Sequence, residues 1–280
     1  VLDTARDLEK DGVEVVYLPV SKKGIVDLKK LEAALDERTI LVSVMYVNNE
    51  VGTIQPIAKI SEIIKNFRKG RNYPLFHTDA VQAFNYLDCN ADMLGVDLLT
   101  LSAQKIYGPK GIGALYVRKQ QTAKILQPII TGGGQEYGFR SGTENVPGIV
   151  GFAKAVELAS NSREQWNKEM RKLQEYFLAR MKKMFPKAQL NGDEKNRLPN
   201  NINLYFPQQS AQDLIIKLDL AGFAVSPGSA CSARTCTPSH VLKAMGFSDE
   251  RATSSIRITF GRPTTKEEID KLTKAFARVL

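Results

Sequence analysis

The sequence is poor in the residues that build disulfide and metal scaffolds, with three cysteines and two histidines among 280 residues. Cys231 and Cys236 form one closely spaced pair, and a single pair cannot complete a four-ligand zinc site. We therefore expect no structural metal. An odd, low cysteine count without a basic-then-apolar signal pattern is typical of a reducing compartment, so we expect a cytoplasmic protein.

Long apolar runs and concentrated charge are also missing. No run approaches the ~20 apolar residues that span a bilayer, so we expect no membrane association. The 39 basic residues exceed the 30 acidic ones, but they are dispersed among acids, as at Lys22-Lys23 and Lys182-Lys183. Nucleic-acid-binding proteins usually concentrate such an excess with interleaved aromatics, so we expect no direct nucleic-acid binding. An acidic protein partner stays open, because positive surface steers association.

The first half of the chain alternates apolar strand patterns with amphipathic helix patterns. This alternation predicts an α/β fold with a largely parallel sheet. The run at 39–45 is continuously apolar, which is typical of a strand buried on both faces. Strands are expected at 13–18, 39–45, 75–79, 98–101 and 113–117. Helices are expected at 27–35 and 57–67.

The pattern changes near residue 150. A long helix is expected at 163–185, followed by a turn-rich stretch, a strand at 202–206 and a helix at 213–220. The C-terminal helix begins with a capping box formed by Thr265 and Glu268. We interpret residues 1–160 as a large α/β domain and residues 161–280 as a smaller α+β domain.

Polar side chains follow three of the predicted strands. The segment Asn48-Asn49-Glu50, Asp79 and Lys105 supply an amide, a carboxylate and an amine where ligands bind in open α/β sheets, at the carboxyl ends of strands. Pyridoxal phosphate (PLP) needs a lysine for its Schiff base and an acid that keeps its pyridine nitrogen protonated. It also needs hydroxyls or backbone amides for its phosphate. The set therefore favours a PLP site.

A series of segments resembles motifs of the cysteine desulfurases, which are PLP enzymes of the class V aminotransferase branch, and the segments follow the family order. They are the asparagine loop at 46–56, the aspartate and glutamine segment at 77–83, the Schiff-base lysine segment at 102–111, a glycine-rich segment at 132–143, the catalytic cysteine loop at 229–232 and the arginine segment at 254–262. The resemblance implies a fold of the aspartate-aminotransferase type and a homodimer. The N-terminal part of the family fold has no counterpart in this chain.

The resemblance also implies roles for the cofactor residues. Lys105 would form the Schiff base and move protons, and Asp79 would pair with the pyridine nitrogen. Gln82 would hydrogen-bond the phenolic oxygen of the cofactor. Ser102 would bind the phosphate, and Thr143 would reach the phosphate of the partner subunit.

Substrate and sulfur chemistry follow from the same resemblance. Asn49, beside the cofactor, and Arg257 would hold the substrate carboxylate, the arginine by a bidentate fork. Cys231 would attack the substrate sulfur, which gives a persulfide and releases alanine, and Arg234 could favour its thiolate. Gln104 stands where the family usually has a histidine that donates to the phosphate. We expect altered or weaker phosphate binding from this replacement.

The implied activity converts L-cysteine to L-alanine and passes sulfur to acceptor proteins such as an iron–sulfur scaffold, or to tRNA thiolation. Two alternatives stay open. A selenocysteine lyase or an aminotransferase would share the cofactor, although transamination needs no loop thiol. A non-catalytic fragment is the other alternative, because the family's upstream phosphate loop and stacking ring are missing. We expect structural roles for Cys89 and Cys236, and packing or hydrogen bonding for His77.

Overall fold

The computed structural model describes residues 1–118, 125–228 and 238–280. The chain divides into two units. The first comprises Val1, 35–46 and 56–163, and the second comprises 2–34, 47–55 and 164–280. The boundary at residue 160 between the two domains of the sequence analysis stays a prediction.

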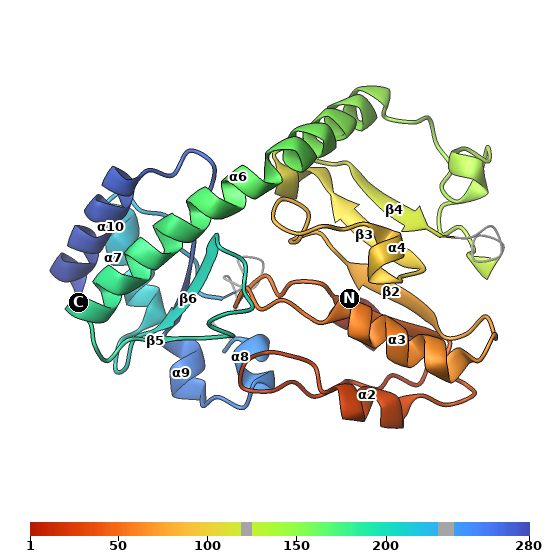
Figure 1. Cartoon of the computed structure of the whole chain (residues 1–280), viewed down its shortest axis with the longest axis horizontal. Helices are drawn as coiled ribbons and strands as arrows, with labels where there is room; N and C mark the ends of the chain where they lie inside the picture. Colours follow the sequence, from red (N-terminus) through yellow and green to blue (C-terminus); the bar gives the residue numbers. More distant parts are fainter. Residues whose placement is uncertain (119–124, 229–237) are drawn as a thin grey trace. The chain divides into compact units, whose positions relative to one another are not determined.

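The first unit contains a four-stranded sheet in the order β1-β2-β3-β4 (Figure 1). Its strands are β1 (Leu41–Met45), β2 (Leu75–Asp79), β3 (Leu98–Ser102) and β4 (Gly113–Val117). The β1–β2 and β2–β3 pairs are parallel, and β4 runs antiparallel to β3. The predicted α/β class with a largely parallel sheet is therefore confirmed.

Helices of the first unit follow the apolar spacing of the sequence. The helix α3 (Ile57–Arg68) buries Ile57, Ile60 and Ile64, which lie on one face at spacings of three and four. A separate apolar cluster joins the turn after β3 to the first part of α6 (Val146–Met184) through Ala103, Ile106, Phe152 and Ala155. The helix α6 is longer than expected, and its residues after Arg163 belong to the second unit. Shorter elements are α4 (Ala91–Leu94), η1 (Ala103–Ile106) and η2 (Glu136–Gly138).

The second unit contains an antiparallel sheet in the order β5-β6-β7. Its strands are β5 (Gln189–Leu190), β6 (Asn201–Tyr205) and β7 (Ser255–Thr259). Its remaining helices are α1 (Leu2–Lys10), α2 (Leu28–Ala34), α7 (Ala211–Leu220), α8 (His240–Ala244), α9 (Asp249–Thr253) and α10 (Lys266–Val279). Aromatic side chains fill its core: Phe206 stacks on Phe276 at 5.5 Å, and Phe177 meets Phe260 edge-on at 5.7 Å.

The predicted capping box is confirmed. Thr265 Oγ1 accepts a hydrogen bond from Glu268 N at 3.2 Å, and Thr265 N donates to Glu268 Oε2 at 2.8 Å. Both bonds satisfy backbone N–H groups at the start of α10 that would otherwise lack partners. The described part of the chain contains no helix that is long and apolar enough to cross a membrane.

Two expectations about strands are wrong. Residues 13–18 form no strand, and Val13, Val16 and Tyr17 are 38%, 59% and 48% exposed. An apolar alternation becomes a strand only where a neighbouring strand accepts its backbone hydrogen bonds, and the described residues provide none here. The strand β1 lies at an edge of the described sheet, and only its Val42 is buried, so it is not buried on both faces.

Candidate active site

The register of β2 and β3 sets the predicted aspartate and lysine segments at neighbouring strand ends. Asp79 is the last residue of β2 and lies opposite Thr100 of β3. The strand β3 ends at Ser102, and Lys105 lies in the 3-10 turn η1 directly after it. Because the two strands are parallel, their carboxyl ends share one edge of the sheet. Asp79, Ser102 and Lys105 are thus brought to the same edge.

The backbone around Lys105 is tightly held. The buried Asn85 donates its side-chain amide to the Lys105 carbonyl at 2.8 Å. The turn then closes at Tyr107, which has a positive φ of 65°, and Gly108 N donates to Ala103 O at 2.8 Å. The Lys105 side chain itself is exposed and forms no ion pair with the described residues. Its amine is therefore available to an incoming carbonyl group, on a turn that these hydrogen bonds hold.

His77 lies two residues before Asp79 and joins three strands through hydroxyl groups. Its Nδ1 is 2.7 Å from Ser43 Oγ, and its Nε2 is 2.8 Å from Thr100 Oγ1. Burial lowers the pKa of His77 below its ordinary value, although the nearby Asp79 opposes this effect. The imidazole is therefore neutral near pH 7, and the predicted hydrogen-bonding role of His77 is confirmed.

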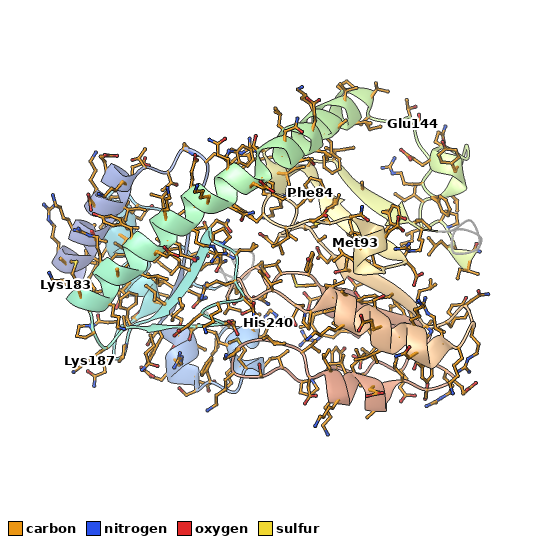
Figure 2. All side chains as sticks on the ribbon, viewed as in Figure 1. Phe84, Met93, Glu144, Lys183, Lys187 and His240 are labelled. Carbon is orange, nitrogen blue, oxygen red and sulfur yellow. The ribbon has the colours of Figure 1, made fainter. Side chains whose placement is uncertain are left out.

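The other predicted cofactor residues lie in turns of the same unit. Gln82 is half-buried in the turns that follow Asp79, where Ala83 N donates to Ala80 O at 2.9 Å. Gln104 is exposed in η1. Thr143 is exposed beside Glu144, which Figure 2 labels. The roles of these three side chains stay predictions.

Asn49 and Arg257 come together in the second unit. Arg257 Nη1 donates to the Asn49 carbonyl at 3.0 Å, and Asn201 Nδ2 donates to the same oxygen at 3.1 Å. The backbone of Arg257 pairs with Ser226 in both directions, at 2.6 and 3.1 Å. The two residues expected to hold the substrate carboxylate therefore form one cluster, anchored on β6 and β7.

The predicted nucleophile Cys231 lies outside the described residues, as do Arg234 and Cys236. Cys89 is the free cysteine of the described part of the chain, and burial raises its pKa to about 12. Its thiolate, the reactive form, is therefore scarce at neutral pH, as expected for a structural cysteine. No group of three or more potential metal ligands occurs among the residues described here.

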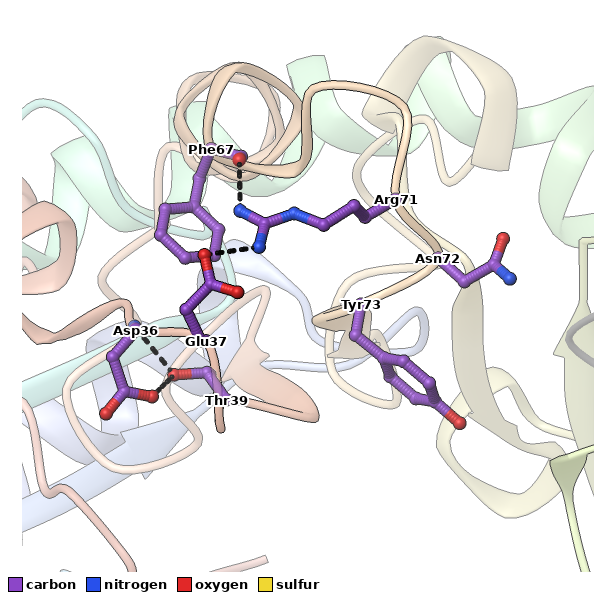
Figure 3. Close-up of a pocket in the computed structure, with 7 residues that line it drawn as sticks. All are labelled: Asp36, Glu37, Thr39, Phe67, Arg71, Asn72 and Tyr73. Carbon is purple, nitrogen blue, oxygen red and sulfur yellow. Dashed lines mark hydrogen bonds and ion pairs between the residues drawn. The ribbon is translucent and has the colours of Figure 1, made fainter.

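A polar cavity of about 390 Å³ lies elsewhere in the first unit (Figure 3). It was not predicted, and none of the predicted site residues lines it. Arg71 pairs with Glu37 at 2.5 Å and covers the ring of Phe67, and Asp36 accepts from Thr39 at 3.0 Å. The lining residues are Asp36, Glu37, Thr39, Phe67, Arg71, Asn72 and Tyr73. The charged side chains that line the cavity are thus paired with other residues of its lining.

Sequence reasoning missed the residues that support the site. Ser43 is the polar residue of the apolar strand β1, and Thr100 interrupts the leucines of β3, so this contrast was the available signal. Asn85 gave no signal, because its bond to Lys105 depends on the path of the turns between them.

The residues that were predicted fit PLP chemically. A carboxylate, an amide, a hydroxyl and an exposed amine follow two neighbouring strands of one sheet, which is the donor set that this cofactor needs.

Comparisons with known proteins identify the family of this chain. The aminotransferase class-V family profile matches residues 2–272. The chain is 45% identical to the cysteine desulfurase IscS of Dictyoglomus turgidum, covering 100% of this chain and 69% of that protein. It is 44% identical to the cysteine desulfurase IscS 1 of Archaeoglobus fulgidus, covering 100% of this chain and 71% of that protein.

Among solved structures, a NifS-like protein superposes with a TM-score of 0.89 at 38% identity, covering 100% of this chain and 71% of that one. This likeness confirms the fold class and the resemblance drawn from the motifs. Enzymes of this family depend on PLP. The chain belongs to the class-V aminotransferase family.

Proposed function

We propose that this protein is a PLP-dependent cysteine desulfurase that converts L-cysteine to L-alanine and carries the sulfur as a persulfide on Cys231. The observation that carries the proposal is the parallel register of β2 and β3, which sets Asp79 beside the strand that leads into the Lys105 turn. It is supported by relatives that are named cysteine desulfurases and are 44–45% identical over the full chain.

Bound PLP supplies a carbonyl group for a Schiff base and a pyridine ring that withdraws electrons from the substrate Cα. Lys105 would provide the amine and would move the proton at the substrate Cα. The carboxylate of Asp79 would keep the ring nitrogen protonated. The neutral His77 beside it brings no positive charge that would compete for this carboxylate. Gln82, Ser102, Gln104 and Thr143 are proposed to orient the ring and the phosphate.

Substrate orientation is assigned to Asn49 and Arg257. A guanidinium group binds a carboxylate through two parallel N–H donors, which fixes direction as well as position. The Asn49 carbonyl and the backbone of Ser226 hold Arg257 in place at 3.0 and 2.6 Å. A held arginine loses less conformational freedom when substrate binds, so the orientation of Cα costs less.

Cys231 is assigned the sulfur step. Its thiolate attacks the sulfur of the bound cysteine, the substrate carbon–sulfur bond breaks, and a sulfur–sulfur bond forms on Cys231. L-Cysteine and one thiol give L-alanine and one persulfide, and the reaction needs no external oxidant. The persulfide would then pass to an acceptor protein, such as an iron–sulfur scaffold, or towards tRNA thiolation, in the cytoplasm.

We also propose a homodimer in which Thr143 reaches the phosphate of the partner subunit. Support comes from apolar side chains that are exposed in the first unit, such as Ile129 and Tyr137 at 99% and 98%. Large apolar side chains left exposed on a folded chain are typical of a surface that another chain covers. Size-exclusion chromatography with light scattering should give twice the chain mass, and a monomer of the PLP-loaded protein would contradict the dimer.

The proposed function can be tested with the Lys105→Ala variant and with serine variants of each of the three cysteines. The PLP-loaded protein should absorb near ~420 nm through its Lys105 Schiff base, and Lys105→Ala should abolish this band. With L-cysteine and a thiol reductant, Cys89→Ser and Cys236→Ser should release alanine and sulfide like the wild type. Cys231→Ser should keep the band and lose sulfide release.

Each alternative has its own signature in this experiment. An aminotransferase would produce a keto acid and would retain full activity in Cys231→Ser. A selenocysteine lyase would release alanine from selenocysteine but not from cysteine. A protein that stays colourless after PLP is added would support the non-catalytic fragment and contradict the proposal.

A further inference from the structure

Glu50 is a buried carboxylate in the asparagine loop, directly after Asn49. Glu50 is 1% exposed, and its carboxylate forms no ion pair with a described lysine or arginine. Its partner is the hydroxyl of Ser239, which donates to Glu50 Oε2 at 2.5 Å. Moving a carboxylate from water into the protein interior costs free energy. A buried carboxylate at this place therefore suggests a specific role for Glu50.

The carboxylate of Glu50 also meets Gly228. A Cβ added to Gly228 would lie 2.8 Å from Glu50 Oε2, and this glycine has a positive φ of 63°. Glycine is thus needed here both for its conformation and for the close approach. In the sequence, Gly228 precedes Cys231 and Ser239 follows it. One carboxylate therefore contacts the chain on both sides of the cysteine segment.

The backbone of the same loop holds the substrate-binding pair. The Glu50 carbonyl accepts from Asn203 Nδ2 at 3.1 Å, and Glu50 N donates to Asn48 Oδ1 at 2.9 Å. The preceding carbonyl, that of Asn49, accepts from Arg257 Nη1 at 3.0 Å. The dipeptide Asn49-Glu50 is thus hydrogen-bonded to Arg257 and to Ser239, and its carboxylate packs against Gly228.

Capping of α8 does not by itself explain the contact. Ser239 Oγ accepts from Leu242 N at 3.2 Å, which satisfies the start of α8, just before His240 (Figure 2). That role uses the hydroxyl as an acceptor, whereas Glu50 uses its proton. Ser248 caps the equally short α9 in the same way, accepting from Arg251 N at 3.2 Å, and has no such carboxylate partner among the described residues.

We propose that Glu50 is a positioning residue for sulfur transfer. By accepting a hydrogen bond from Ser239 and packing against Gly228, it sets the attachment points of the Cys231 segment relative to the carboxylate site of the substrate. The inference rests on the proposed desulfurase function. It predicts that loss of the Glu50–Ser239 bond slows sulfur transfer to Cys231 far more than it weakens cysteine binding.

Substitutions at Ser239 separate the two roles of its hydroxyl. Ser239→Thr keeps the cap and the donor. Ser239→Asp keeps a good N-cap but has no proton for Glu50 and sets two carboxylates face to face. Ser248→Asp is the matched control, because it makes the same change at the cap of α9. Glu50→Gln, which is nearly isosteric, tests the other partner.

The PLP-loaded variants would be mixed with L-cysteine in a single turnover. The Cys231 persulfide would be trapped by alkylation and quantified by mass spectrometry, while the change of the PLP absorption band reports substrate binding. Misplacement of a reacting group by about 1 Å can cost ~100-fold in rate. We expect persulfide formation to slow ~10- to 100-fold in Ser239→Asp and Glu50→Gln, with the concentration of half-maximal band change altered less than ~threefold. Ser239→Thr and Ser248→Asp should match the wild type.

The double variant Glu50→Gln/Ser239→Asp should be no slower than the slower single variant, since both remove one interaction. Equal slowing in Ser239→Asp and Ser248→Asp would overturn the proposal, as would wild-type rates in Glu50→Gln. A wild-type protein that forms no Cys231 persulfide would overturn the proposed function as well, so the two failures are distinguishable. Circular dichroism and thermal unfolding identify a variant that fails to fold, and Glu50→Gln and Ser239→Asp provide independent routes to the same result.

Discussion

Arg257 donates a hydrogen bond from Nη1 to the backbone carbonyl of Asn49 at 3.0 Å, across 208 positions of sequence. The bond joins β7 to the asparagine loop, and Asn201 reinforces it by donating to the same carbonyl. This carbonyl orients the guanidinium that the proposed function assigns to the substrate carboxylate.

Replacement of Arg257 by lysine should weaken cysteine binding while leaving the cofactor in place. A lysine keeps the positive charge but cannot offer two parallel donors to a carboxylate and reach the Asn49 carbonyl at once. We expect kcat/KM for L-cysteine to fall ~10- to 100-fold, with an unchanged absorption band of bound PLP. Steady-state alanine formation checks this, and a wild-type KM in Arg257→Lys would show that another group binds the carboxylate.

How far the sequence predicts this site depends on the range of the interactions. The meeting of the Asp79 and Lys105 segments follows from parallel strands whose patterns are strong and local. The capping box of Thr265 and Glu268 is equally local. The strand expected at 13–18 failed because its hydrogen bonds depend on a partner that the pattern does not encode.

Side-chain partners from distant elements escaped prediction for a related reason. The Ser43–His77–Thr100 contacts require the register of three strands, and a shift by one residue would turn each side chain to the other face. The contact of Glu50 with Ser239 spans 189 positions and depends on how the loop packs in the second unit. The family motif identified Asn49, whereas the contact of its neighbour Glu50 with Ser239 is visible only in the folded structure.

His77 should make the stability of the protein depend on pH. Burial lowers its folded-state pKa below the ordinary value of 6.5, so the unfolded chain binds more protons as the pH falls. The stability contributed by the neutral imidazole is fully present above pH ~6.5 and is lost as the pH falls from there through the lower folded-state pKa. Urea unfolding at pH 7.5 and 5.5 should show a larger loss for the wild type than for His77→Gln, by on the order of 1 kcal/mol. Equal losses would show that His77 is protonated in the folded protein.

Cys89 should resist alkylation in the folded protein. Burial raises its pKa to about 12, so its thiolate fraction at pH 8 is far below that of a free cysteine. We expect iodoacetamide to modify Cys89 at least ~100-fold more slowly in the native protein than in urea, as measured by peptide mass spectrometry. Rapid native labelling of Cys89 would show that its segment opens, and activity losses on alkylation could then no longer be assigned to Cys231 alone.

Arg197 should be among the most costly residues to replace in the second unit. It is 1% exposed, and its guanidinium donates to the carbonyls of Val51, Asn191, Asp193 and Asn201 at 3.0 to 3.4 Å. Arg197→Met would fill similar space but take these donors away from the buried carbonyls, of which that of Asn201 still accepts from Gln174 Nε2 at 3.1 Å. Since each buried unsatisfied acceptor costs ~1–3 kcal/mol, we expect the free energy of unfolding to fall by about 3 kcal/mol or more.

The exposed Arg171 on α6 supplies the control for this change. Urea unfolding of Arg171→Met should differ from the wild type by less than about 0.5 kcal/mol, as is usual for surface substitutions. Because Arg197 holds the Val51 carbonyl, two positions from Asn49, Arg197→Met should also raise KM for L-cysteine. A strongly destabilised Arg197→Met with a wild-type KM would show that the asparagine loop keeps its place through Asn201, Asn203 and Arg257 alone.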